Sequence, residues 1–227
     1  MQSLEESIFQ SVKSKDLCNL VLDAGEVAMD SLLDDGVARD IPIFGSLVKV
    51  CNAYHSVREK IFARKIYKFL SEISLTPAPE RAQILEDIAN SKGGMNAAGV
   101  AVLELVDKLD SDIKPELVGK LFNACGSGYI STADFLRLSD VISKIYISDL
   151  LILQDALPTG VATVQQKNIF LSLGLMIFSV KNPARASTTG TSMLQVASDI
   201  YDKKFELEYV LTIDAARISK HCFGIDR

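Results

Sequence analysis

The sequence predicts a mainly α protein, in which a multi-helical domain over residues 1–147 precedes a small α+β domain over 148–227. Apolar residues recur at helical spacing through the first part of the chain, whereas short stretches after Pro158 alternate as strands do. The chain has 227 residues, of which 48% are hydrophobic, so it can bury a substantial core. We therefore expect a folded protein rather than a disordered one.

The first predicted helices, one or two in number, cover residues 3–34, where apolar side chains lie three or four positions apart. Gly36 and Pro42 then break the pattern, and it resumes at Gly45 as a long helix that ends shortly before "SLTPAPE". The apolar face of this long helix drifts by about a quarter-turn along its length. We expect the helix to change its packing partner, or to bend between residues 52 and 58.

The middle of the chain predicts four more helices, over 78–90, 96–109, 113–124 and from Ser131 to Ile145. Pro77 and Pro115 suit the first turn of a helix, where a missing N–H group costs nothing. Ser131, with Asp134 three positions later, has the pattern of a capping box. The stretch "NSKGGMN" between the first two of these helices is the clearest linker.

The C-terminal part predicts a helix over 163–173, a strand in "MIFSVK", a polar segment, a strand in "KKFELEYVLT" and a last helix over 213–222 capped by Thr212. This order, with its "LGL…YVLT" pattern, resembles bacterial winged-helix modules over about 148–225. The resemblance implies a DNA-recognition helix over 163–173, with Gln165, Gln166 and Lys167 as candidate contacts. Lys167 is the only cation in that helix, which weakens this interpretation.

The overall composition sets limits on partners and location. The chain has 24 basic and 29 acidic residues, a net charge of −5, which argues against bulk binding to nucleic acid but permits local patches. The four cysteines are scattered without a Cys-x-x-Cys pair, and the N-terminus lacks the pattern of a secretion signal. The longest apolar run, 169–180, is shorter than the roughly 20 residues that span a bilayer. We expect reduced thiols and a cytoplasmic location.

Charge is distributed unevenly near the N-terminus. Residues 41–70 contain six basic groups and one acidic group, whereas residues 1–40 contain three basic and nine acidic groups. This contrast predicts that the two segments pair, within one chain or between chains. The candidate interaction surface consists of Arg58, Lys60, Arg64, Lys65 and Lys68. A solvated or acid-paired helix face is the preferred interpretation, and the alternatives are a membrane-surface helix over 41–73 and a face that binds nucleic acid.

Residues 123–135, "NACGSGYISTADF", fall in the register of a calcium-binding loop. They offer a single carboxylate, Asp134, where calcium prefers several. We therefore predict a helix–turn–helix corner, in which Gly126 and Gly128 end one helix and Ser131 caps the next.

Four other side chains, Cys51, His55, His221 and Cys222, are of the types that bind zinc. Adjacent His and Cys residues rarely reach one metal, and Cys51 also fits the apolar face of its helix. The chain has neither a phosphate-binding loop nor a known catalytic signature. We predict no metal, no cofactor and no catalytic residue.

The run "MDSLLDDGVARDIPIFGSLVKVCNAYHSVREKIFARKIYKFL" resembles a widespread set of uncharacterised bacterial proteins with an "LDDG…DIPxxG…FxxKxxxFL" style of sequence. The later "GYISTADFLRL" segment and the "LGL…LT" tail also match, so the resemblance spans most of the chain. It brings no activity and no catalytic residues, and it implies a setting in mobile or accessory bacterial loci, including phage defence.

The function that these observations favour is a non-enzymatic, cytoplasmic protein-interaction or regulatory module that forms a homo-oligomer. Two alternatives remain open: a membrane-surface effector acting through 41–73, and a DNA-binding regulator acting through the winged-helix-like region.

Overall fold

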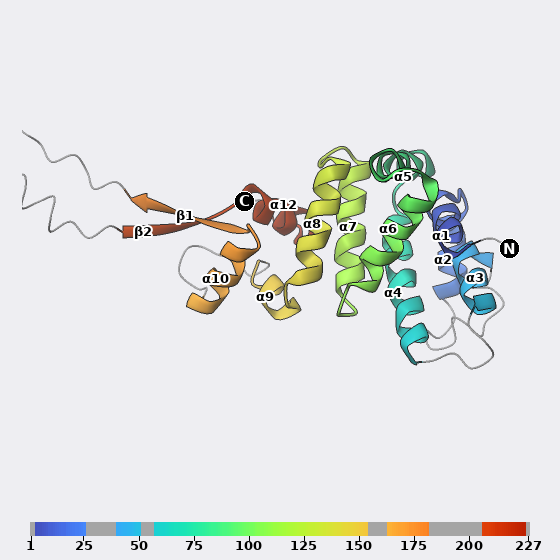
Figure 1. The fold of residues 1–227 in the computed structure, drawn as a ribbon, viewed down its shortest axis with the longest axis horizontal. Helices are drawn as coiled ribbons and strands as arrows, with labels where there is room; N and C mark the ends of the chain where they lie inside the picture. The colour runs from blue at the N-terminus through green and yellow to red at the C-terminus, as the bar shows by residue number, and fades with distance from the viewer. Residues whose placement is uncertain (1–2, 26–39, 51–56, 154–162, 182–205, 226–227) are drawn as a thin grey trace, which may run out of the picture.

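The computed structural model describes residues 3–25, 40–50, 57–153, 163–181 and 206–225 (Figure 1). In this part of the chain the protein is mainly helical, with eleven helices and a small antiparallel sheet near the C-terminus, as the sequence predicts. The elements are α1 (Leu4–Lys13), α2 (Leu17–Gly25), α3 (Pro42–Val50), α4 (Val57–Ile73), α5 (Ala78–Lys92), α6 (Met95–Asp107), α7 (Lys114–Gly126), α8 (Thr132–Lys144), α9 (Ile147–Leu151), α10 (Val164–Ser172), β1 (Met176–Lys181), β2 (Glu206–Leu211) and α12 (Ile213–Phe223).

Helix α1 packs against α3, α5 and α6 at the N-terminal end of the molecule. Its side chains Ile8, Phe9 and Val12 are buried on one face. A buried contact of 2.5 Å joins the hydroxyl groups of Ser7 and Ser46, which links α1 to α3. Paired hydroxyls satisfy each other inside a core that offers no water.

Of the long helix predicted from Gly45, the described residues form α3, which ends at Val50, and α4, which begins at Val57. Helix α3 packs on α1 and α4 packs along α7, which confirms the expected change of packing partner. The predicted bend between 52 and 58 falls largely outside the described residues. Pro42 begins α3 rather than breaking a helix, because the first turn needs no N–H group from it.

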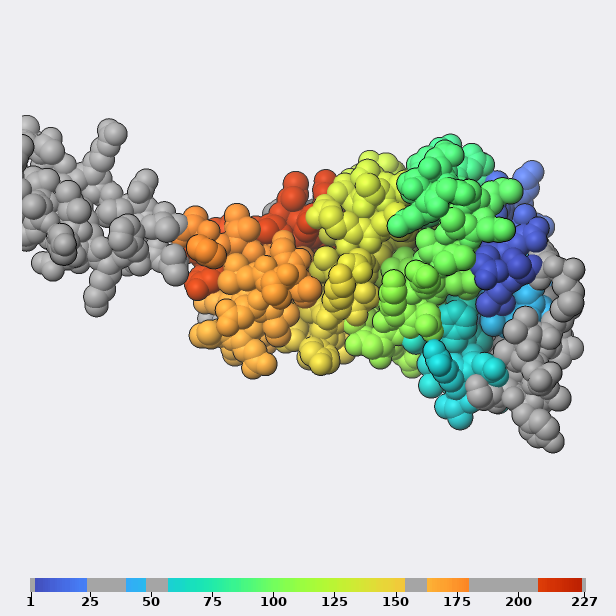
Figure 2. Space-filling model, in the orientation of Figure 1, coloured from blue at the N-terminus to red at the C-terminus, as the bar shows by residue number. Residues whose placement is uncertain are grey.

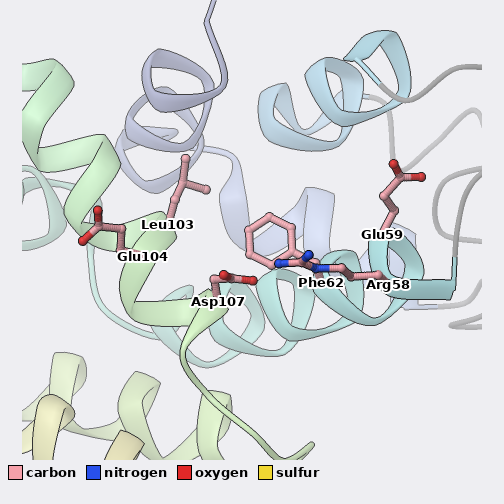
Figure 3. Close-up of a pocket in the computed structure, with 6 residues that line it drawn as sticks. All are labelled: Arg58, Glu59, Phe62, Leu103, Glu104 and Asp107. Atoms are coloured by element: carbon pink, nitrogen blue, oxygen red, sulfur yellow. The ribbon is translucent and has the colours of Figure 1, made fainter.

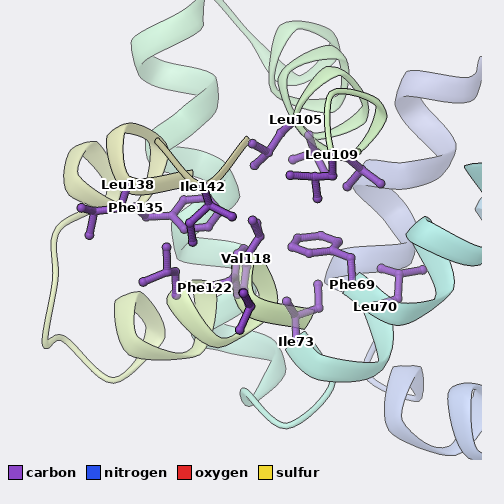
Figure 4. Packing of buried hydrophobic residues seen from close by; sticks show 14 of the residues in the cluster. Phe69, Leu70, Ile73, Leu105, Leu109, Val118, Phe122, Phe135, Leu138 and Ile142 are labelled. Atoms are coloured by element: carbon purple, nitrogen blue, oxygen red, sulfur yellow. The ribbon is translucent and has the colours of Figure 1, made fainter. Parts of the chain in front are cut away.

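The centre of the core lies between α4, α7 and α8 (Figure 4). Three phenylalanine rings meet there edge to face: Phe69 and Phe122 have centroids 6.0 Å apart, and Phe122 and Phe135 have centroids 5.5 Å apart. Each ring thus places its positive edge against the negative face of the next ring. All three side chains are almost fully buried.

The corner between α7 and α8 has the predicted helix–turn–helix form. Helix α7 ends at Gly126, Gly128 takes a positive φ of 75°, and the hydroxyl of Ser131 accepts from the N–H of Asp134 at 3.1 Å. The amide of Asn123 donates to the carbonyl of Glu72 at 3.0 Å and accepts from Thr76 at 2.6 Å. Asn123, the first position of the calcium-loop register, therefore holds the end of α4 in place.

Both predicted strands form, and β1 pairs with β2 in antiparallel register, with Met176 opposite Leu211. Thr212 caps α12 by accepting from the N–H of Ala215 at 3.4 Å, and its hydroxyl donates to Gly174 at 2.7 Å. The predicted order of helix, strand, strand and helix is thus present, while residues 182–205 between the strands lie outside the described part.

Helix α12 returns to the helical body and packs on α7. Its residue Cys222 is buried and donates to the carbonyl of Leu117 at 3.6 Å, and Ser219 donates to Leu153 at 3.4 Å. One hydrophobic cluster includes residues from both sides of position 147, so the core is continuous across that position. The division into domains at 147 stays a prediction.

Candidate interaction surfaces

The basic face of α4 contacts the connection between α6 and α7. The ammonium group of Lys65 donates to the carbonyl of Asp107 at 3.3 Å, and that of Lys68 donates to the carbonyl of Asp112 at 2.8 Å. Lys68 also lies 3.1 Å from Glu116, and Arg64 lies 3.8 Å from the carboxylate of Asp112. Three of the five predicted surface residues therefore hold a loop of the same chain.

The partners described for these cations lie elsewhere than the predicted ones, but part of the predicted acidic segment falls outside the described residues, so the pairing with residues 1–40 stays a prediction. The sequence places the acidic partner of this helix within residues 1–40, whereas the ion pairs described for Arg64 and Lys68 lie at 112 and 116. The physical reason is that α4 packs along α7, so its cations face the loop that leads into α7. Charge counts along a sequence do not indicate which helices pack together.

At its N-terminal end, α4 borders a groove of about 470 Å³ with the end of α6 (Figure 3). The lining residues are Arg58, Glu59, Phe62, Leu103, Glu104 and Asp107. The side chains of Arg58 and Phe62 reach toward Asp107 in Figure 3. Because three carboxylates and one guanidinium line this groove, the end of α4 that carries Arg58 does not continue a positive surface. Lys60 is partly exposed on the same helix.

A second groove, of about 620 Å³, lies between α5 and α8, and sequence reasoning gave no sign of it. Several of its polar groups are engaged within the chain. Thr132 donates to the carboxylate of Asp87 at 3.0 Å, and Arg137 binds Asp134 at 2.7 Å and also pairs with Asp214. Arg137 thus ties α8 to α12 rather than opening toward a ligand.

The predicted recognition helix is α10, and two of its three candidate residues contribute to local structure. The side chain of Gln166 accepts from the N–H of Thr163 at 2.8 Å and completes a capping box. The ammonium group of Lys167 lies 5.0 Å from the centroid of the Tyr209 ring, which is a cation–π contact with β2. Gln165 is exposed.

The β1–β2 ribbon projects from the helical body and carries exposed apolar side chains (Figure 1). Ile177 is 54% exposed and stands opposite Val210, which is 42% exposed, while Phe178 next to it is 60% exposed. Figure 2 shows the α10 and β1 residues at one end of the described part of the chain. The alternation of residues along the sequence predicts these strands, but it does not indicate that their apolar side chains are exposed in the described part of the chain.

The candidate zinc ligands do not converge among the described residues. The His221 ring stacks on Tyr129 with centroids 5.6 Å apart, whereas Cys222 points into the core, where burial raises its pKa to about 12. Burial also raises the pKa of Cys125, whose sulfur lies 3.7 Å from the hydroxyl of Thr132. Cys51 and His55 fall outside the described part of the chain.

Within the described ranges, no group of three or more His, Cys, Asp or Glu side chains is placed to hold a metal ion. Among the helices described, none combines the length and the apolar character that crossing a bilayer requires.

Comparison with known proteins finds no family model, curated protein or solved structure that matches this chain. The resemblance to uncharacterised bacterial proteins and to winged-helix modules therefore stays a prediction.

Proposed function

We propose that this protein is a non-enzymatic, cytoplasmic interaction module that self-associates through the β1–β2 ribbon. The observation that carries the proposal is that the helical body leaves apolar side chains exposed on both faces of the ribbon, Ile177 and Val210 on one face and Phe178 on the other. A two-stranded ribbon is marginally stable in water by itself, and an apolar surface on it favours a partner that covers it.

The size of this surface suits a reversible association. Covering one half-exposed aliphatic or aromatic side chain contributes about 1 kcal/mol, so three per copy contribute at most about 6 kcal/mol in a symmetric dimer. Lost translational and rotational freedom opposes association by roughly 4–15 kcal/mol. We therefore expect a dimer whose population rises with protein concentration, rather than a permanent one.

The basic face of α4 supports the fold more than it supports binding. Lys65, Lys68 and Arg64 are engaged with the α6–α7 connection, so a membrane or nucleic acid would have to compete with these intramolecular contacts. On α10, the side chains of Gln166 and Lys167 also make contacts within the chain. The ribbon is thus the better candidate surface.

The test is the mass of the purified protein by light scattering over a range of concentrations, at low and at high salt. We expect the mass to approach that of a dimer at high concentration and to change little with salt, because apolar contacts are not screened. The double variant Ile177→Thr/Val210→Thr keeps β-branched residues in both strands and should remain monomeric.

A matched control is Met95→Gln, which removes an equally exposed apolar side chain, 64% exposed, from the start of α6. This variant should associate like the wild type. A wild-type chain that is monomeric at every concentration contradicts the proposal. Recruitment to anionic vesicles or to duplex DNA that disappears at high salt favours α4 or α10 instead.

A further inference from the structure

One hydrogen bond shows which facing residue pairs of the β1–β2 ribbon exchange backbone hydrogen bonds. The N–H of Thr212 donates to the carbonyl of Leu175 at 3.0 Å, one step before the pair of Met176 and Leu211. In an antiparallel ladder, pairs that exchange hydrogen bonds alternate with pairs that do not. Ile177 and Val210, two steps from Leu175 and Thr212, therefore belong to the bonded set.

The intervening residues turn their backbone groups outward. Phe178 and Tyr209 face each other as a non-bonded pair, so their N–H and C=O groups point away from the ladder, as do those of Met176 and Leu211. Among the described residues, none of these outward groups has a backbone partner. Within the described part of the chain the ribbon thus has two open edges, one on β1 and one on β2, and an open edge favours pairing with another strand.

Charge distinguishes the two edges. The one charged residue of β1 is Lys181 at its end, opposite Glu206 in the ladder, whereas β2 also carries Glu208, which is exposed opposite Ser179. A two-fold pairing of β2 with a second β2 brings two carboxylates onto adjacent strands, which is unfavourable. Pairing of β1 with β2 of another copy leaves open edges and adds further copies without limit. Only β1 pairing with β1 avoids both problems.

We propose that two copies of this chain pair antiparallel along their β1 edges and form a four-stranded sheet in the order β2–β1–β1–β2. This inference rests on the proposed self-association and names its geometry. The outward residues of β1 have even numbers and must pair with one another, so the registers that pair five residues of each strand place the two-fold axis beside Phe178 or Ser179. Both exposed side chains then lie against the neighbouring strand of the second copy.

The first experiment removes one outward N–H group. Phe178→Pro deletes an N–H that the β1–β2 ladder does not use, whereas Phe178→Thr removes the same ring and keeps the N–H. On the other edge, Tyr209→Pro and Tyr209→Thr form the matched pair. We expect Phe178→Pro to weaken dimerisation at least tenfold relative to Phe178→Thr, and the two Tyr209 variants to dimerise equally.

The second experiment measures which strands are adjacent and uses no proline. In these registers the two Ser179 positions are diagonal or directly opposite neighbours, at most about 7–8 Å apart, so a short bismaleimide should link two copies of Ser179→Cys. The two β2 strands are separated by three strand spacings, about 14 Å, so Glu208→Cys should not be linked. The wild-type chain, with its own four cysteines, gives the background.

The outcomes separate this inference from the proposed function. If the wild type is monomeric, the proposed self-association itself fails. If the wild type dimerises but Phe178→Pro behaves like Phe178→Thr, self-association stands and pairing of the β1 edges is wrong. Linking through Glu208→Cys without linking through Ser179→Cys also overturns the β1 geometry.

Discussion

Lys68 on α4 lies 3.1 Å from Glu116 in the first turn of α7, and the same ammonium group donates to the carbonyl of Asp112 at 2.8 Å. Its side chain is only 21% exposed, so these contacts are partly shielded from water. Glu116 also stands near the N-terminal end of α7, where a carboxylate is favourable. The cation therefore fastens the start of α7 to the middle of α4.

Reversing this charge should destabilise the protein. In Lys68→Glu, two contacts of the ammonium group are lost and a carboxylate faces Glu116, so we expect unfolding to become easier by about 2 kcal/mol. Urea denaturation measures this change. The double variant Lys68→Glu/Glu116→Lys should recover part of the loss, because opposite charges face each other again.

Lys60 provides the control for Lys68, since it lies on the same helix and has no ion pair in the described residues. Lys60→Glu should change the free energy of unfolding by less than about 0.5 kcal/mol. Equal effects of Lys60→Glu and Lys68→Glu would show that the general charge of α4 matters and that the contact with Glu116 does not.

Arg81 should be more sensitive than any surface cation. Its residue is 2% exposed, its Nε donates to the carbonyl of Val12 at 2.7 Å, and its other nitrogens donate to Thr76 and Ser14. It thus binds carbonyl groups at the end of α1 and in the α4–α5 turn. Arg81→Lys keeps the charge but cannot reach all three carbonyls, so we expect a loss of about 3 kcal/mol.

The same substitution at an exposed site, Arg58→Lys, should be nearly neutral in urea denaturation. A loss below about 1 kcal/mol for Arg81→Lys would mean that one ammonium group and water replace the guanidinium, and the fork-like geometry would then not be required.

Local signals explain which parts of this fold are predictable. The caps at Ser131 and Thr212 depend on a hydroxyl and an N–H three residues later, so the sequence is sufficient to place them. The partner of Lys68 depends on how α4 and α7 pack, and Glu116 is 48 positions away in the sequence. Arg81 carries no local sign that it is buried. Tertiary contacts of this kind cannot be obtained from spacing alone.

The crossing of α1 and α6 should not accept a larger residue at Gly99. A Cβ atom there would lie 2.7 Å from the carbonyl carbon of Glu5, and it would overlap the carbonyl oxygen further. In an open helix, Gly→Ala stabilises by about 1 kcal/mol. Here we expect Gly99→Ala to destabilise by about 2 kcal/mol, because backbone rather than a flexible side chain must move.

Val100→Ala is the neighbouring control for Gly99→Ala, because that side chain is 39% exposed and its truncation should cost little. Thermal melts of both variants give the comparison. A Gly99→Ala variant that melts higher than the wild type would show that α1 and α6 can separate without loss.

Acid should weaken the attachment of α12 through Asp134. Hydrogen bonds from Arg137 and then from Ser131 hold the pKa of this carboxyl below its ordinary value of 3.8, and Arg217 on α12 lies 3.1 Å away. Because the folded pKa is below the unfolded one, the stabilisation is fully present above the unfolded value and disappears as pH falls through the folded value. Asp134→Asn should therefore lower the melting temperature at about pH 7 and much less at about pH 3.

Asp140→Asn, which removes an exposed pair with Lys144 in the same helix, should have a small effect at both pH values. An Asp134→Asn penalty that is the same at both pH values would mean that the ionised carboxylate is not the source of the stabilisation.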